Sequence, residues 1–172
     1  MTAEGIESKS WEIVRSYLET ASPAQWHIFA AKSNYDGNGQ ALRWLIDNPK
    51  TDRGTVLMIY WNLGAGWYVQ FSSENECDAE HQRSTYRLLR LIEQRYFSNY
   101  HTHANIWFDP HHSEGARPDE YSEISVKRPI PEIMLQPVNG SEYVEIESNP
   151  DGYDDGLPIA VVEALYALHD DN

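Results

Sequence analysis

Apolar residues in the first hundred positions recur mainly at intervals of three and four, the period of an amphipathic α-helix. The pattern predicts a run of helices over about 8–20, 23–34, around 42–46, 53–63 and 78–97. Ser22 and Pro23 supply an N-cap and a first-turn proline for the second helix. Pro49 stops the third, and Asp52 can cap the fourth. The apolar run Trp67–Phe71 fits either a helix or a short strand.

Shorter apolar stretches follow in the second half of the chain. Ala104–Phe108, Ile124–Val126 and Tyr143–Ile146 have the composition or alternation of short strands. A last helix is expected from Gly156–Leu157–Pro158 to about Leu168. We therefore predict an α+β fold with a mainly helical N-terminal half, a small antiparallel sheet and a C-terminal helix. Residues 1–172 are expected to form a single domain, with the helical part over 8–98 and the sheet, loops and final helix over 99–170.

Charge and targeting signals narrow the choice of partner. The net charge is −14, and the ten acidic residues after Arg128 are accompanied by no Lys or Arg. This charge disfavours nucleic acid and anionic membranes as partners. Met1–Ser10 lacks the apolar core of a secretory signal, and no apolar run reaches the length of a membrane span. We expect a cytoplasmic protein without disulfides, because Cys77 is the single cysteine.

One segment resembles a known kind of domain. It reads Asn34-Tyr35-Asp36-Gly37, followed by Leu42-x-Trp44-Leu45-Ile46-x-x-Pro49-x-x-Asp52-x-x-Thr55-x-Leu57-x-x-x-Trp61. Over about residues 23–71 this is similar to a bacterial domain family of unknown function, whose members are of the kind found as toxin-immunity proteins. The chain departs from the family pattern at Thr51, where cysteine is frequent, and at Gly54, where alanine is usual. The resemblance implies no catalytic residue.

The same motif has a physical interpretation that needs no partner. Asp52 can cap a helix, and Thr55 can join the capping network. Trp44 and Trp61 are expected to pack between neighbouring helices.

No catalytic constellation stands out in the sequence. The histidines His101, His103, His111 and His112 lie close together in the sequence, and with Asp109 they are the candidate ligands of a zinc site, although their spacing fits no strong signature. The acidic loop that starts at Asp151 has Val162 where a calcium loop needs a bidentate Glu. We therefore expect no cofactor and no enzyme activity. A metal-dependent enzyme using the four histidines is the alternative, and a regulatory protein-binding module is another.

The C-terminal acidic surface is the predicted partner-binding site. Carboxylates interleaved with tyrosines can attract and anchor a basic protein surface. The residues are Glu142, Tyr143, Glu145, Glu147, Asp151, Tyr153, Asp154 and Asp155. We expect an immunity protein (antitoxin) that neutralises a toxin or effector domain with a basic surface; a surface around Trp67 and Tyr68 is the second choice of interface.

Overall fold

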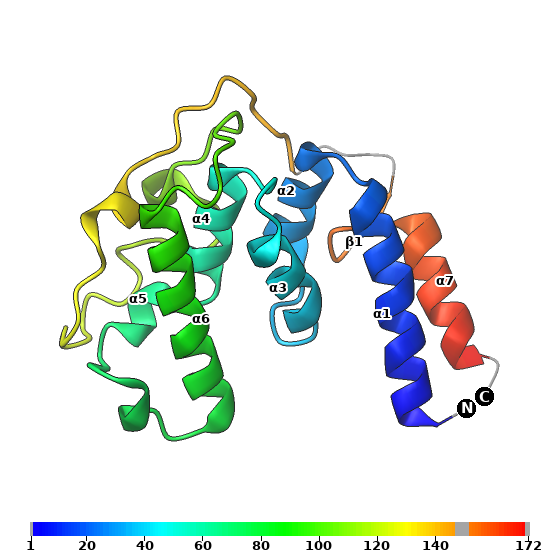
Figure 1. Cartoon of the computed structure of the whole chain (residues 1–172), viewed down its shortest axis with the longest axis horizontal. Helices are drawn as coiled ribbons and strands as arrows, with labels where there is room; N and C mark the ends of the chain where they lie inside the picture. Colours follow the sequence, from blue (N-terminus) through cyan, green and yellow to red (C-terminus); the bar gives the residue numbers. More distant parts are fainter. Residues whose placement is uncertain (1, 147–151, 171–172) are drawn as a thin grey trace. The chain divides into compact units, whose positions relative to one another are not determined.

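The structure is a computed structural model that describes residues 2–146 and 152–170 (Figure 1). Its α-helices are α1 (Ala3–Thr20), α2 (Pro23–Lys32), α3 (Gly39–Asp47), α4 (Arg53–Asn62), α5 (Ala65–Tyr68), α6 (Glu80–Phe97) and α7 (Ile159–Asp170). The 3-10 helices are η1 (Glu74–Glu76), η2 (Pro110–His112) and η3 (Glu132–Leu135), and the strands are β1 (Tyr153–Asp154) and β2 (Leu157–Pro158).

The fold class is α+β, as predicted: seven α-helices, the last near the C-terminus, accompany one two-stranded antiparallel sheet in the described residues. The chain divides into two compact units, Met1–Asp47 with Val144–Asn172, and Asn48–Tyr143. That the two form a single domain stays a prediction. None of the helices in the described ranges is long and apolar enough to cross a membrane.

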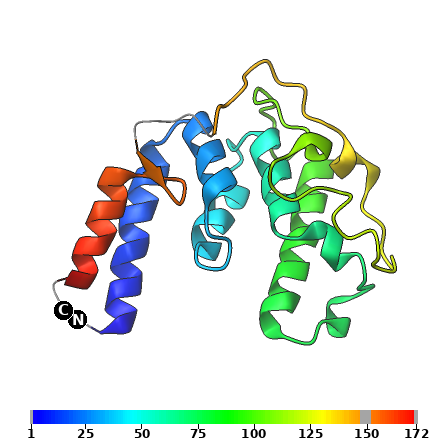
Figure 2. The ribbon, with the colours of Figure 1, turned by 180° about the vertical axis from the view of Figure 1, so that it is seen from behind.

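In the first unit, the predicted second helix begins where the sequence placed its cap. Ser22 Oγ accepts from the Gln25 amide at 3.2 Å, and the Gln25 side chain accepts from the Ser22 amide at 2.8 Å. This capping box satisfies two backbone donors at the start of α2. The indole of Trp26 on α2 donates to the Leu18 carbonyl of α1 at 2.8 Å. Helix α7 lies beside α1 (Figure 2).

The small sheet lies elsewhere than predicted. Strands β1 and β2 form a hairpin in which Tyr153 pairs with Pro158 and Asp154 with Leu157. Asp155 and Gly156 between them have φ values of 48° and 81°, the left-handed angles of the tight turn that the right-handed twist of a hairpin favours. The segment Gly156–Leu157–Pro158 therefore closes a hairpin, and α7 begins only at Ile159.

The three predicted strands are wrong in position. In Ala104–Phe108 only Ile106 and Phe108 pair, through isolated bridges to Glu142 and Val138. Ile124–Val126 and Tyr143–Ile146 contain no strand residue. The prolines between these segments explain the difference, since a proline has no amide to donate to a ladder and Pro137 borders one of the bridges.

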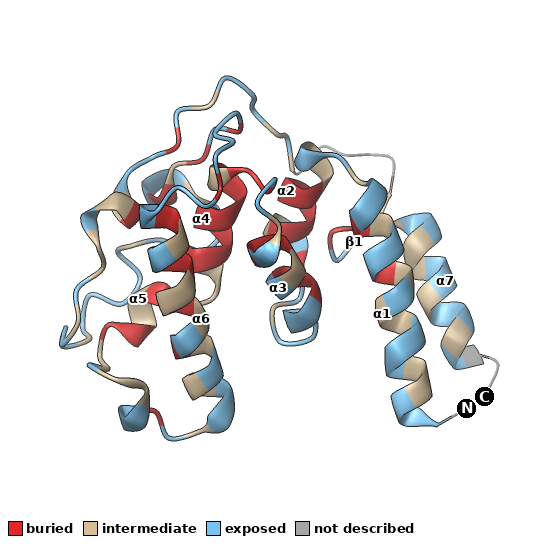
Figure 3. Cartoon of the chain, viewed as in Figure 1, coloured by how far each residue is buried: buried red, intermediate tan, exposed pale blue. Residues whose placement is uncertain are grey.

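Helix α4 forms the centre of the second unit. All residues from Gly54 to Trp61 are buried (Figure 3). Leu89 and Ile92 of α6 are fully buried, as are Met134 of η3 and Ile106 from a loop. The ambiguous Trp67–Phe71 run is helical at Trp67 and Tyr68 and then turns, so it is no strand.

A buried histidine in the first unit gives a pH-dependent prediction. His27 on α2 is 2% exposed, and burial lowers its pKa from 6.5 to about 4. The unfolded chain therefore takes up a proton at a higher pH than the folded chain does. Its contribution to stability is complete above about pH 7.5 and is lost as the pH falls through 6.5 toward 4.

We expect the wild-type protein to lose about 2 kcal/mol more unfolding free energy than His27→Gln between pH 7.5 and pH 5. The difference between the two proteins removes the contribution of carboxylates that titrate in both. Urea unfolding at each pH measures it, and NMR titration of the His27 ring gives the pKa directly. Equal pH dependence in the two proteins, or a ring pKa near 6.5, would contradict the prediction.

Candidate functional site

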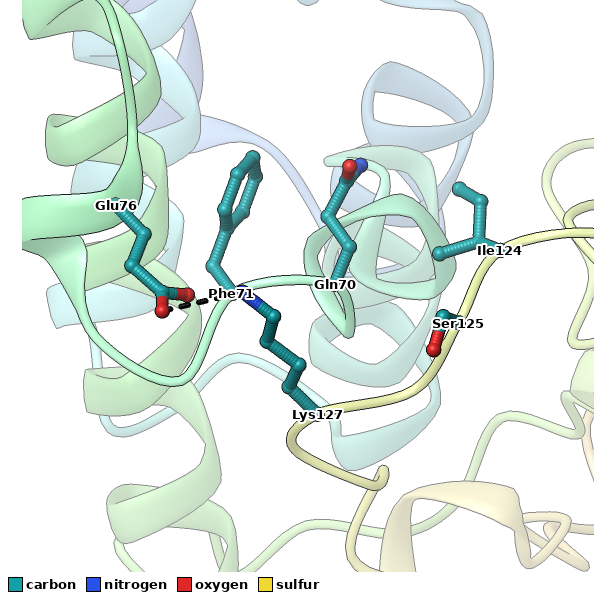
Figure 4. A pocket seen from close by; sticks show the side chains of 6 residues that line it. All are labelled: Gln70, Phe71, Glu76, Ile124, Ser125 and Lys127. Atoms are coloured by element: carbon teal, nitrogen blue, oxygen red, sulfur yellow. Dashed lines mark hydrogen bonds and ion pairs between the residues drawn. The ribbon is translucent and has the colours of Figure 1, made fainter.

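An open hollow lies on the surface of the second unit. Its volume is about 550 Å³. Two chain segments face each other across it (Figure 4), residues 70–76 on one side and 124–127 on the other. The lining side chains are Gln70, Phe71, Glu76, Ile124, Ser125 and Lys127.

The first wall is built on an aromatic cluster at the end of α5. The Phe71 ring lies 5.2 Å from the Trp67 ring and 6.0 Å from the Tyr68 ring, measured between centroids. The Gln70 side-chain amide donates to the Trp67 carbonyl at 2.9 Å. Tyr68 is buried, so the aromatic surface predicted around Trp67 and Tyr68 has Trp67 and Phe71 as its more accessible members.

The carboxylate of Glu76 is held in place at the edge of the hollow. Its Oε2 accepts from the Ser72 amide at 2.8 Å, and its Oε1 accepts from the Ser72 hydroxyl at 3.1 Å. The Lys127 ammonium, which reaches over from the opposite wall, donates to Oε1 at 3.2 Å (Figure 4). The Ser72 amide, followed by Lys127, lowers the pKa of Glu76. Glu76 is therefore a charged acceptor whose position depends mainly on its own loop.

The opposite wall is tied to the first through the backbone. The amides of Lys127 and Arg128 both donate to the Val69 carbonyl, at 2.9 and 3.0 Å. The Arg128 guanidinium also reaches the Glu93 carboxylate of α6, with nitrogen–oxygen distances of 3.2 and 2.8 Å. A bidentate pair of this kind fixes direction as well as distance. The 124–127 segment therefore has a defined position beside residues 69–71.

Glu93 is 7% exposed, and its buried carboxylate is stabilised by contacts with three side chains. Besides Arg128, it accepts from the Tyr60 hydroxyl of α4 at 2.8 Å and pairs with Arg90 at 2.9 Å. Burial, and then the neighbouring Glu93, raises the pKa of Tyr60, so this phenol stays a donor. A buried carboxylate satisfied in this way is structural, and it anchors the wall of the hollow to α4 and α6.

The structure does not bring the predicted acidic residues together in one unit. Glu142 and Tyr143 belong to the second unit, whereas Glu145, Tyr153, Asp154 and Asp155 belong to the first. Glu147 and Asp151 lie outside the described residues. Tyr153 is half-buried and accepts from the Gln25 side chain at 3.3 Å, which gives it a packing role. The carboxylates of the set that are described are exposed: Glu142, Glu145, Asp154 and Asp155.

Tyr143 has an exposed aromatic neighbour that the sequence did not indicate. The Tyr143 side chain is 74% exposed, and its ring lies 5.9 Å from the 36% exposed ring of Trp107. The Trp107 amide donates to the Glu142 carbonyl at 2.8 Å, which places the two segments next to each other. This pair is a small exposed aromatic patch.

The four histidines have separate environments. His101 is fully buried and His103 is exposed. The His111 ring is 3.1 Å from the Leu135 carbonyl, and the His112 ring is 2.7 Å from Asp109 Oδ2. Across residues 2–146 and 152–170 there is no group of three or more His, Cys, Asp or Glu side chains arranged to hold a metal ion.

The residues of the motif that resembles the family of unknown function have capping and packing roles. Asp52 caps α4 as predicted, accepting from the Gly54 amide at 2.9 Å, and it also accepts from the amides of Asn105 and Ile106 at 2.7 and 3.3 Å. A Cβ at Gly54 would lie 2.6 Å from the Ile106 carbonyl oxygen. The close approach of this loop therefore explains why position 54 is occupied by glycine in this chain. Trp61 is buried, while Trp44 is half-buried and packs edge-on against Trp26.

The hollow was missed at the sequence level because its two walls are about fifty residues apart in the chain. Glu76 and Lys127 meet across it at 3.2 Å, and no local spacing signals that contact. The one available signal was the concentration of aromatic residues around Trp67, of which Trp67 and Phe71 are half-exposed and Tyr68 is buried.

Comparison with known proteins covers only part of the chain. No curated protein and no solved structure shows significant similarity to it. One family of proteins matches a segment that begins just before α2 and ends with α6. The segment includes Asp52, Glu76 and Glu93 and stops before Lys127. Residues 21–97 are similar to a family described as a domain of unknown function (DUF4274).

Proposed function

We propose that this chain is an immunity protein that binds and neutralises a toxin or effector domain with a basic surface. The observation that carries the proposal is the charge distribution: ten acidic residues and no Lys or Arg follow Arg128. The similarity of residues 21–97 to a domain of unknown function is compatible with this role and names no other.

The accessibility of the acidic residues supports the same function. Glu142, Glu145, Asp154 and Asp155 are exposed, and within the described residues none of them forms an ion pair with a basic side chain. Their charge is available to a partner. Complementary charge raises association rates by about 10- to 1000-fold at low salt, which suits a protein that must reach its toxin quickly.

Protection of growing bacteria tests the proposal. A toxin gene neighbouring the gene for this chain is expressed alone and together with it, and we expect co-expression to restore growth. Persistent arrest, despite soluble expression of this chain, would refute the immunity function. The charge-neutralised variant for comparison carries Glu145→Gln, Asp154→Asn and Asp155→Asn.

The charge-neutralised variant should associate with the toxin at least several-fold more slowly than the wild type at low salt. Its association rate should also depend less steeply on ionic strength. Stopped-flow mixing at two salt concentrations measures both quantities. A control variant with the same change in net charge neutralises three exposed acids of α1: Glu4→Gln, Glu7→Gln and Glu12→Gln. Equal rates for the two variants would mean that the acidic residues after Arg128 contribute only to net charge.

A further inference from the structure

We infer that the hollow between residues 70–76 and 124–127 receives an arginine side chain from the basic partner, and that Lys127 occupies its cation position until the partner arrives. The inference rests on the proposed function for the identity of the partner as a basic protein. Its chemistry rests on the hollow itself, which combines one fixed carboxylate with two apolar side chains, Phe71 and Ile124 (Figure 4).

Glu76 is suited to receive a guanidinium. Ser72 holds both of its oxygens through contacts that do not involve Lys127, at 2.8 and 3.1 Å. Ser72 is held in turn, because its carbonyl accepts from the Tyr86 hydroxyl of α6 at 3.1 Å. A carboxylate that is already oriented loses little freedom when a partner's cation binds.

The remaining walls match the rest of an arginine side chain. Phe71 and Ile124 offer apolar surface to its methylene groups, and an aromatic face also attracts a guanidinium. Gln70 and Ser125 provide polar atoms that can accept further guanidinium protons. Arginine suits this site better than lysine, because its planar fork can bind a carboxylate through two parallel hydrogen bonds.

Lys127 can leave at little cost. Its side chain is 55% exposed and that of Glu76 is 34% exposed, so water screens their ion pair. Exposed pairs of this kind shift an equilibrium by about five-fold or less. The Lys127 backbone stays in place because its amide donates to the Val69 carbonyl. The side chain can therefore swing away while the wall of the hollow remains.

Charge complementarity determines the occupant. The chain has a net charge of −14, so a basic partner is attracted as a whole. Lys127 itself demonstrates that this hollow accommodates a cationic side chain on Glu76. An acidic or neutral side chain would gain no comparable contact.

The test uses N-acetyl-arginine methylamide as the probe and the neutral citrulline analogue as its control. Because the Ser72 amide donates to Glu76, its NMR resonance reports on binding at that carboxylate. We expect saturable shifts with the arginine probe, and an affinity about two- to five-fold higher in Lys127→Met, where no lysine has to be displaced. Lys50→Met, an exposed lysine of the same unit, makes the same change in net charge and should leave the affinity unchanged.

Glu76→Gln should abolish the response, whereas Glu132→Gln, at an exposed position of the same unit, should not. Equal shifts with the citrulline analogue, or equal affinity in Lys127→Met and wild type, would overturn the inference. The titration contains no toxin, so its outcome is separate from that of the growth assay. Arginine binding without protection would refute the immunity function alone, and protection without arginine binding would refute this site alone.

Discussion

Trp61→Ala is expected to lower the unfolding free energy by about 3 to 5 kcal/mol, the range for deleting a buried large aromatic side chain. Trp61 is 1% exposed, and its indole donates to the Met134 carbonyl at 3.0 Å. The substitution therefore leaves a cavity in the second unit and a buried carbonyl without its donor. The midpoint of thermal unfolding, followed by circular dichroism, should fall by about 6 to 20 °C.

Two further variants separate the effect of the cavity from that of the lost hydrogen bond. Trp61→Phe retains most of the ring but loses the hydrogen bond to Met134, so it should lose clearly less stability than Trp61→Ala. Trp107→Ala, at a 36% exposed position, should lose much less again. A midpoint for Trp61→Ala equal to that for Trp107→Ala would mean that Trp61 does not fill the core.

The helices were predictable because their signals are local. Ser22 and Asp52 cap α2 and α4 through residues within three positions of themselves, and Gly64 follows the end of α4. Helical period and capping chemistry are both readable over a single turn. Only boundaries shifted, as at α1, which begins at Ala3 and not near Ser8.

The strands were harder because pairing depends on a partner segment. Ile106 and Phe108 have suitable side chains, yet they pair only as bridges, since the facing segment begins after Pro137. Asp155-Gly156 is a strong hairpin signal, but its flanking strands have two residues each and lack visible alternation.

Buried ionic groups could not be assigned from sequence. Glu93 looks like any acid on a charged helix, and its burial follows from Tyr60 and Arg128, which are 33 and 35 residues away. The hollow depends on the same distant contact, because Arg128 positions the wall that carries Lys127. Sequence alone could therefore indicate an acidic, aromatic-rich α+β protein, but not which residues face one another.

The motif aspartate should prove as important for stability as the core tryptophan. Asp52 is 2% exposed and accepts hydrogen bonds from three backbone amides, those of Gly54, Asn105 and Ile106. Asp52→Ala leaves these donors without their acceptor. At about 1 to 3 kcal/mol for each buried donor left unsatisfied, and with Asn105 only part-buried, the expected loss is about 2 to 5 kcal/mol.

Asp52→Ser separates the two roles of this side chain. Serine is a good N-cap, so it should retain the contact at the start of α4, but it is too short to reach the amides of Asn105 and Ile106. We expect it to recover about 0.5 to 2 kcal/mol of the alanine loss. Amide hydrogen exchange should then accelerate at Ile106 while protection of α4 is largely retained. If exchange at Ile106 is unchanged in both variants, Asp52 serves only as a helix cap, and the loop must be held against α4 by other contacts, namely the packing of Ile106 and the hydrogen bond from the Arg53 amide to the His103 carbonyl at 2.8 Å.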